Sequence, residues 1–187
     1  MKSLYSIAIQ PSEEIIASVK LMKEQLAAKI GWFNSKNSLA HITLNEFEAS
    51  DADLLRIKKQ LTQLCDSLHP TQVSFTSYGN YPNNGAFFLA PDEESKKDLK
   101  VIMKHINDGL KAPSKFKSSD PHMSIARRLS PEKLAVADGF FPPADFSFLC
   151  DSVVLREFNP ERKQFEVTEA FTFNGNTSSV FVQGSLF

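Results

Sequence analysis

The sequence contains two copies of the pattern His-x-Thr/Ser-x, which begin at His41 and at His122 and have Ile, Leu or Met at the x positions. In an extended strand, side chains two residues apart point to the same face. His41 would therefore share a face with Thr43, and His122 would share one with Ser124. Imidazole titrates near neutral pH, and a hydroxyl can donate to an anionic oxygen. Two such pairs across a cleft would hold a phosphate between an acid and a base.

The two copies have similar surroundings along the chain. Pro11 precedes His41 by thirty residues and Pro91 precedes His122 by thirty-one, and each proline ends an apolar strand-like run and begins a helix-like one. This repeat predicts two lobes related by a pseudo-twofold axis. Such an axis would bring the two histidines to opposite sides of one cleft.

The composition favours one domain, 1–187, that binds a small anionic ligand. The chain is long enough to bury a full core, and its 21 basic and 22 acidic residues leave almost no net charge for gripping long nucleic acid. Cys65 and Cys150 lack metal-type spacing, so we expect neither a disulfide nor a metal. With no signal peptide and no membrane helix in the sequence, we expect a soluble, cytoplasmic protein without an obligate protein partner.

The hydrophobic pattern predicts an α+β fold with two pseudosymmetric lobes, each an antiparallel-type sheet with outer helices, around a central cleft. The lobes would comprise roughly 1–70 and 85–140, with 71–84 and 141–175 completing the sheets. The predicted elements are, in order, a strand 4–9, a helix 12–30 capped by Ser12, a motif strand 41–47, a helix 53–68, strands 72–78 and 86–89 around a hinge loop 79–85, a helix 92–110, a loop 111–120, the second motif strand, a helix 131–137 and a hairpin of 147–158 with 164–173.

Five further residues are candidates for substrate binding. Phe47, Tyr81 and Phe116 could stack on a base, although core packing is the more expected role of a phenylalanine in this Phe-rich chain. Strict alternation from His122 would turn Arg127 away from the cleft and leave Arg128 on the cleft side.

The two remaining histidines have ordinary structural interpretations. His69 adjoins a proline at a helix end, and His105 lies within a predicted helix, so we expect neither in the active site.

With these residues in place, the chain resembles the two-histidine (2H) phosphoesterase superfamily, which includes bacterial RNA 2′,5′-ligases and 2′,3′-cyclic phosphodiesterases. Both copies match its His-x-Thr/Ser-x signature, and the order of elements is similar from Leu4 to about Phe173. The resemblance implies an enzyme without metal or cofactor. It also implies that the two histidines act as general acid and base and that the two hydroxyls hold the phosphate; some members carry an arginine at the position of Arg127.

The hypothesis is a cyclic phosphodiesterase that acts on a small nucleotide or an RNA terminus bearing a 2′,3′-cyclic phosphate. The alternative is an RNA 2′,5′-ligase, in which the same two histidines would join a 2′,3′-cyclic phosphate to a 5′-hydroxyl. A non-catalytic binder of phosphorylated nucleotides would not need two titrating groups, and an interaction protein that uses its Phe-containing tail would leave the repeated motif unexplained.

Overall fold

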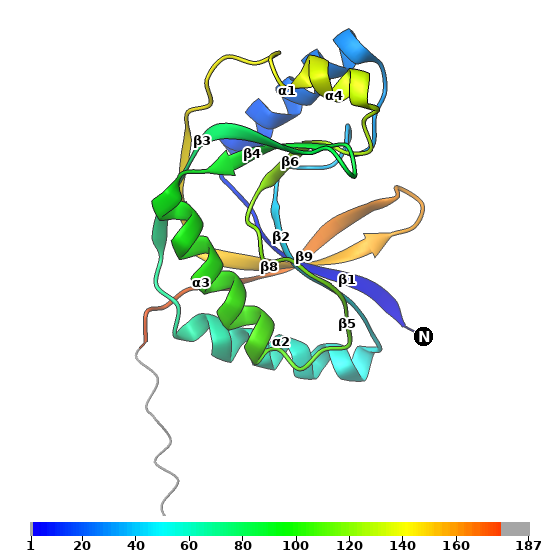
Figure 1. Cartoon of the computed structure of the whole chain (residues 1–187). Coiled ribbons are helices and arrows are strands. Elements are labelled where there is room, and N and C mark those ends of the chain that lie inside the picture. Colours follow the sequence, from blue (N-terminus) through cyan, green and yellow to red (C-terminus); the bar gives the residue numbers. More distant parts are fainter. Residues whose placement is uncertain (1, 177–187) are drawn as a thin grey trace, which may run out of the picture.

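Two antiparallel sheets face each other in the computed structural model, which describes residues 2–176, and helices cover their outer sides (Figure 1). The first sheet has the order β5-β2-β1-β8-β9 and consists of β1 (Ser3–Ile9), β2 (Ile42–Ala49), β5 (Ser114–Lys117), β8 (Ser152–Asn159) and β9 (Gln164–Thr172). The second has the order β6-β4-β3-β7 and consists of β3 (Thr71–Tyr81), β4 (Ala86–Pro91), β6 (Met123–Ala126) and β7 (Phe146–Cys150). The expected α+β architecture with two lobes is confirmed.

The helices are exchanged between the two halves of the chain. The four helices of the described residues are α1 (Glu13–Ile30), α2 (Asp51–Asp66), α3 (Glu93–Gly109) and α4 (Pro131–Ala137). Helix α1 comes from the first half but contacts β6 and α4, on the side of the second sheet (Figure 1). Helix α3 comes from the second half and contacts α2 and the first-sheet strand β2, as well as β3 and β4 of the second sheet. Each half of the chain therefore covers part of the other half's sheet.

Each of the four helices has an acidic residue in its first turn, and Ser12 lies at the N-cap of α1 as expected but does not cap the helix with its side chain. Side chains do cap the other three helices: Ser50 accepts from the amide of Asp53, Asp92 accepts from that of Ser95, and Ser130 accepts from that of Lys133. These bonds satisfy amides that the helix itself leaves without partners.

Three predicted segments differ from the observed elements. The range 147–158 is two strands rather than one, because the chain leaves β7 in the second sheet at Cys150 and enters β8 in the first at Ser152. The expected hinge loop 79–85 is mostly the end of β3 and a tight turn into β4. The expected loop 111–120 contains β5, a short edge strand that pairs with β2.

A β-bulge follows the hydroxyl residue of each motif strand. In β2, Thr43 lies opposite Ala8 and Asn45 opposite Ile7, so Leu44 is an extra residue. In β6, Ser124 lies opposite Phe88 and Ala126 opposite Phe87, so Ile125 is the extra residue. A bulge reverses which face the following side chains occupy. The two copies are therefore alike in backbone geometry as well as in sequence.

None of the helices within residues 2–176 is long and apolar enough to cross a membrane. Both cysteines are buried free thiols. The Phe-containing tail considered above, 177–187, lies outside the described residues.

Candidate active site

The two motif histidines make the same hydrogen bond. His41 lies immediately before β2, and its Nδ1 is 2.7 Å from the carbonyl oxygen of Leu39. His122 lies immediately before β6, and its Nδ1 is 2.9 Å from the carbonyl oxygen of Asp120. A carbonyl can only accept, so each Nδ1 carries the proton. In the neutral ring this leaves Nε2 as the nitrogen that can accept a proton.

A hydroxyl accompanies each imidazole, as the alternation predicts. Thr43 and Ser124 lie two residues after their histidines and are half-buried, while the flanking Ile42 and Met123 are fully buried. Neither hydroxyl makes a side-chain hydrogen bond to another residue of the described chain. Both are therefore available to donate to a ligand.

The loop between α1 and β2 connects the two motif strands. The backbone amide of Arg127 donates to the carbonyl oxygen of Asn34 at 3.1 Å, and the Ser35 hydroxyl donates to the carbonyl oxygen of Ile125 at 3.2 Å. The loop that leads into His41 is thus bonded directly to the strand that follows His122.

Lys23 holds this loop from the side of α1. Its side chain is almost fully buried, and its Nζ donates to the carbonyl oxygens of Ser35 and Ser38 at 3.1 and 2.7 Å and to the Ser38 hydroxyl at 3.1 Å. Burial lowers the pKa of Lys23 to about 8. The three acceptors oppose that effect by stabilising the ammonium form. Sequence reasoning did not find this residue, because it looks like an ordinary lysine on an amphipathic helix.

Positive charge surrounds His41. Burial holds the pKa of His41 well below its ordinary value, and the nearby charge of Arg156 acts in the same direction. The hydrogen bond to Leu39 opposes these effects, while the charges of Lys23 and Arg127 add to them. His41 is therefore neutral at physiological pH and able to accept a proton.

His122 has a different environment. Burial lowers the pKa of His122 as well, but the hydrogen bond to the Asp120 carbonyl and the negative charge of the Asp120 carboxylate both oppose the shift. The ring packs against Phe88 and Tyr81 at centroid distances of 4.7 and 5.7 Å. The Tyr81 hydroxyl donates to the same Asp120 carboxylate, which with burial raises the pKa of Tyr81 to about 12. Tyr81 thus contacts His122, and its role in substrate binding stays a prediction.

The bulge at Leu44 contradicts the predicted stacking role of Phe47. Beyond the bulge, Asn45 and Phe47 point to the core, and the Phe47 side chain is 0% exposed and stacked on Tyr5. Glu46 takes the face of Thr43 instead. Phe47 therefore cannot contact a substrate.

Phe116 lies on the face of the first sheet that carries Thr43. It pairs with Glu46 across β5 and β2, so both side chains share the face of Thr43, and Phe116 is 51% exposed. Directly paired residues of an antiparallel ladder point to the same face. Its contact with a substrate stays a prediction.

The bulge at Ile125 also reverses the expected roles of the two arginines. Beyond it, Arg127 returns to the face of His122 and Ser124, and its charge lowers the pKa of both His41 and His122. Arg128 adopts a φ of 56° and leaves the strand. The expectation that Arg128 rather than Arg127 faces the cleft is wrong, because it assumed an unbroken alternation.

Arg156 is a site residue that sequence reasoning missed. In β8 it lies opposite Ser6, which lies opposite Glu46, so all three share the sheet face that carries Thr43. Arg156 is 6% exposed, and burial lowers its pKa to about 10, a value at which it still carries its charge at neutral pH. A signal was present: a single basic residue follows the apolar run 153–155 in the strand, where a buried charge is unusual.

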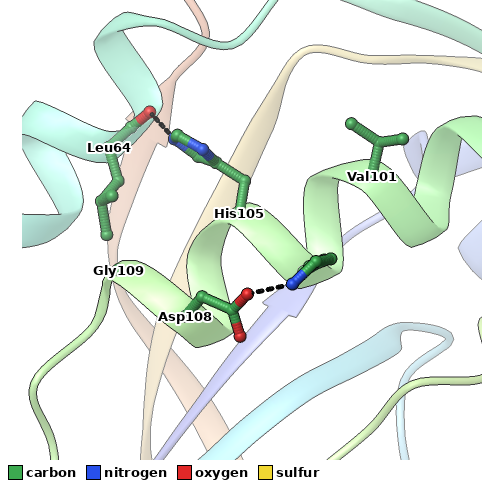
Figure 2. Close-up of a pocket in the computed structure, with 6 residues that line it drawn as sticks. Leu64, Val101, His105, Asp108 and Gly109 are labelled. Carbon is green, nitrogen blue, oxygen red and sulfur yellow. Dashed lines mark hydrogen bonds and ion pairs between the residues drawn. The ribbon is translucent and has the colours of Figure 1, made fainter.

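The other two histidines lie away from the motif strands. His69 is exposed beyond the end of α2. His105 lines a surface hollow of about 540 Å³ between α2 and α3, where its Nε2 is 3.1 Å from the Leu64 carbonyl oxygen (Figure 2). The hollow also contains the Lys104–Asp108 ion pair and no residue of either motif. Their expected place outside the active site agrees with these positions.

Sequence comparison identifies the family. Residues 12–161 match the family described as the 2′-5′ RNA ligase superfamily, so the chain belongs to that superfamily, and the resemblance to two-histidine phosphoesterases is confirmed. A comparison with curated protein sequences finds no match.

Solved structures show the same fold in distant relatives. The TT0787 protein of Thermus thermophilus is 20% identical, with a TM-score of 0.63 over 93% of this chain and 100% of that one. E. coli LigT, in a complex with 3′-AMP, is 16% identical, with a TM-score of 0.64 over 92% and 99% of the two chains. Kluyveromyces marxianus Usb1 is 12% identical, with a TM-score of 0.57 over 91% and 97%. At these identities the likeness extends to the fold alone.

Proposed function

We propose that the protein hydrolyses 2′,3′-cyclic phosphates of RNA ends or small nucleotides by two-histidine acid/base catalysis, without a metal or a cofactor. The observation that carries the proposal is the matched hydrogen bond from Nδ1 of His41 and of His122 to a backbone carbonyl. This bond fixes both rings with Nε2 as the reactive nitrogen, and each ring has a hydroxyl two residues away on the same strand face.

In this reaction a water oxygen bonds to phosphorus while one of the two phosphorus–ribose oxygen bonds breaks. One imidazole takes a proton from the water, and the other gives a proton to the departing ribose oxygen. Thr43 and Ser124 donate to the non-bridging phosphate oxygens, on which negative charge develops. The product is a ribose monophosphate with one free hydroxyl, and proton transfer between the two rings through solvent restores the starting state.

The charges around the two rings support an assignment of roles. His41 lies near three cationic side chains, which favour its neutral form, and we assign it as the base. His122 lies near the Asp120 carboxylate, which favours its protonated form, and we assign it as the acid. Arg127, whose charge acts on both rings, is placed to neutralise the phosphate between them.

Two aromatic side chains are the proposed contacts of the nucleoside. Phe116 offers an exposed ring on the face of the first sheet that carries Thr43, and Tyr81 lies beside His122 on the second sheet. Base–aromatic stacking tolerates different bases. A nucleotide ligand is also supported by E. coli LigT, which has the same fold and has been crystallised with 3′-AMP and with ATP.

RNA 2′,5′-ligation is the second candidate, favoured by the description of the superfamily. It opens the same cyclic phosphate with a different nucleophile: a 5′-hydroxyl oxygen bonds to phosphorus in place of water, one of the two phosphorus–ribose oxygen bonds breaks, and the two imidazoles take and give the protons. The near-zero net charge of the chain does not favour a broad surface that would hold two RNA ends together, so hydrolysis is the leading proposal.

The test is turnover in the presence of a chelator. The purified protein is offered 2′,3′-cyclic nucleotides, an RNA oligomer ending in a cyclic phosphate, and ADP-ribose cyclic phosphate. We expect hydrolysis by the wild type and a loss of several orders of magnitude in kcat for His41→Ala and for His122→Ala. His69→Ala, at an exposed histidine, is the control and should retain activity. Tight binding without turnover would favour a non-catalytic nucleotide binder, and unchanged rates in both motif variants would refute the two-histidine mechanism.

A further inference from the structure

A buried arginine on the face of the first sheet that carries Thr43 lacks a carboxylate partner within the described residues. Arg156 donates from Nη2 to the Ser6 hydroxyl at 2.7 Å, and its Cζ is 5.3 Å from the centre of the Phe165 ring. Its Nε is buried without a hydrogen-bond partner, and no carboxylate of the described chain lies within 4.0 Å of its side-chain nitrogens. Glu46, on the same face, is the acidic residue whose charge acts on it from farther away.

Such an arrangement is costly for the free protein. A buried guanidinium without a counter-ion loses its hydration and gains little in return. Neither Ser6 nor the Phe165 ring neutralises the charge. A bound anion would supply the missing partner, and the planar N–H groups of arginine suit the oxygens of a phosphate.

The position of Arg156 relates it to the proposed phosphate site. The cross-strand pairs place Phe116, Glu46, Ser6 and Arg156 in one row across β5, β2, β1 and β8. Thr43 lies in the adjacent row on the same face, two strands from β8, which corresponds to about 10 Å between strand axes. The long Arg156 side chain spans part of this distance.

We propose that Arg156 forms a second anion subsite on the sheet face that carries Thr43 and that the preferred substrate carries a further phosphate besides the cyclic one. The proposal rests on the proposed function, since it takes the motif residues as the site of the cyclic phosphate. A mononucleoside 2′,3′-cyclic phosphate lacks the second group. An RNA end has it in the preceding phosphodiester, and ADP-ribose cyclic phosphate has it in the pyrophosphate.

The experiment compares substrates that differ in one charge. A dinucleotide ending in a 2′,3′-cyclic phosphate is prepared with a natural phosphodiester linkage and with a neutral methylphosphonate linkage. ADP-ribose cyclic phosphate and a mononucleoside cyclic phosphate form the other arms, which distinguish the two sources of the second phosphate. The measured quantity is the ratio of kcat/KM for the charged dinucleotide to that for the neutral one, which cancels general effects on catalysis.

We expect the wild type to prefer the charged dinucleotide by about tenfold or more, mainly through KM. Arg156→Gln should bring the ratio close to one, and Arg156→Lys should restore part of it. Arg162→Gln is the matched control, because Arg162 is an exposed arginine in the turn between β8 and β9 that pairs with Glu166, and it should keep the wild-type ratio. Preference for ADP-ribose cyclic phosphate alone would assign the subsite to a pyrophosphate.

Two outcomes would overturn the inference: a wild-type ratio near one together with no preference for ADP-ribose cyclic phosphate over the mononucleoside, or a preference that persists in Arg156→Gln. If Arg156→Gln does not fold, the kcat/KM ratios of the wild type and of Arg156→Lys still test the inference. Complete absence of turnover would instead refute the proposed function. In that case calorimetric binding of dinucleotide 3′-monophosphates with charged and neutral linkages tests the subsite by itself.

Discussion

The Ser35 hydroxyl donates to the carbonyl oxygen of Ile125, the extra residue of the bulge in β6. The bulge in β2 is supported in a similar way, since the carbonyl oxygen of Leu44 accepts from the amide of Ser118 at 2.9 Å and from Asn107 Nδ2 at 3.3 Å. Both bulges therefore have partners outside their own ladders. The bond at Ile125 also joins the first half of the chain to the second, because it links the loop before His41 to β6.

Lys23→Met should damage the site from a distance. The change removes the donor to the carbonyl oxygen of Ser38, while that of Ser35 keeps the amide and hydroxyl of Ser38, and the loss should lower the free energy of unfolding by about 1–3 kcal/mol. Displacement of the loop should also lower kcat/KM, by up to about 100-fold. Urea denaturation and cyclic-phosphate hydrolysis measure the two effects. Lys20→Met, at an exposed position of α1, is the control, and equal behaviour of the two variants would contradict the role of Lys23.

Removal of either motif hydroxyl should slow the chemical step. Thr43→Val and Ser124→Ala each delete a donor to the charged phosphate oxygens, and we expect a decrease of about 10²- to 10³-fold in kcat. Steady-state kinetics provide the measurement, with Ser18→Ala on the exposed face of α1 as a comparison. A change confined to KM would show that the hydroxyls bind substrate without stabilising the transition state.

The pH dependence of kcat/KM should be bell-shaped with its maximum below about pH 6.5. The pKa values of His41 and His122 are both lowered, and kcat/KM rises as the base loses its proton and falls as the acid loses its own. Asp120→Asn removes a charge that raises the pKa of His122, so the descending limb should move to lower pH. A wild-type maximum above pH 7, or an unmoved limb in the variant, would contradict the assigned roles.

Phe47 and Phe116 should respond oppositely to truncation. Phe47→Ala empties a fully buried position and should destabilise the fold by about 3–5 kcal/mol. Phe116→Ala should leave stability nearly unchanged and raise KM for nucleotides by about 5- to 100-fold, since stacking contributes roughly 1–3 kcal/mol per base. Thermal unfolding and kinetics separate the two effects; an unaltered KM in Phe116→Ala would remove this ring from the proposed nucleoside contacts.

Sequence periodicity predicted most elements and the repeated motif, because amphipathic helices and alternating strands leave clear patterns. It did not predict the bulges, since Leu44 and Ile125 are ordinary aliphatic residues and nothing local distinguishes them from paired strand positions. One extra residue in a strand reverses the face on which every later side chain lies, which is why strict alternation places Phe47 and Arg127 on the wrong faces. The sequence also did not predict which sheet each helix covers, because an apolar helix face does not specify the sheet that it packs against.

The exchanged helices have a consequence for how the chain can be divided. A cut in the turn between β3 and β4 would separate α1 from β6 and α4. It would also divide both sheets, because β3 belongs to the second sheet and β5, β8 and β9 belong to the first. Neither fragment would contain a complete lobe, despite the repeated order of elements. We expect each fragment to be poorly structured alone and to regain structure only when it associates with the other.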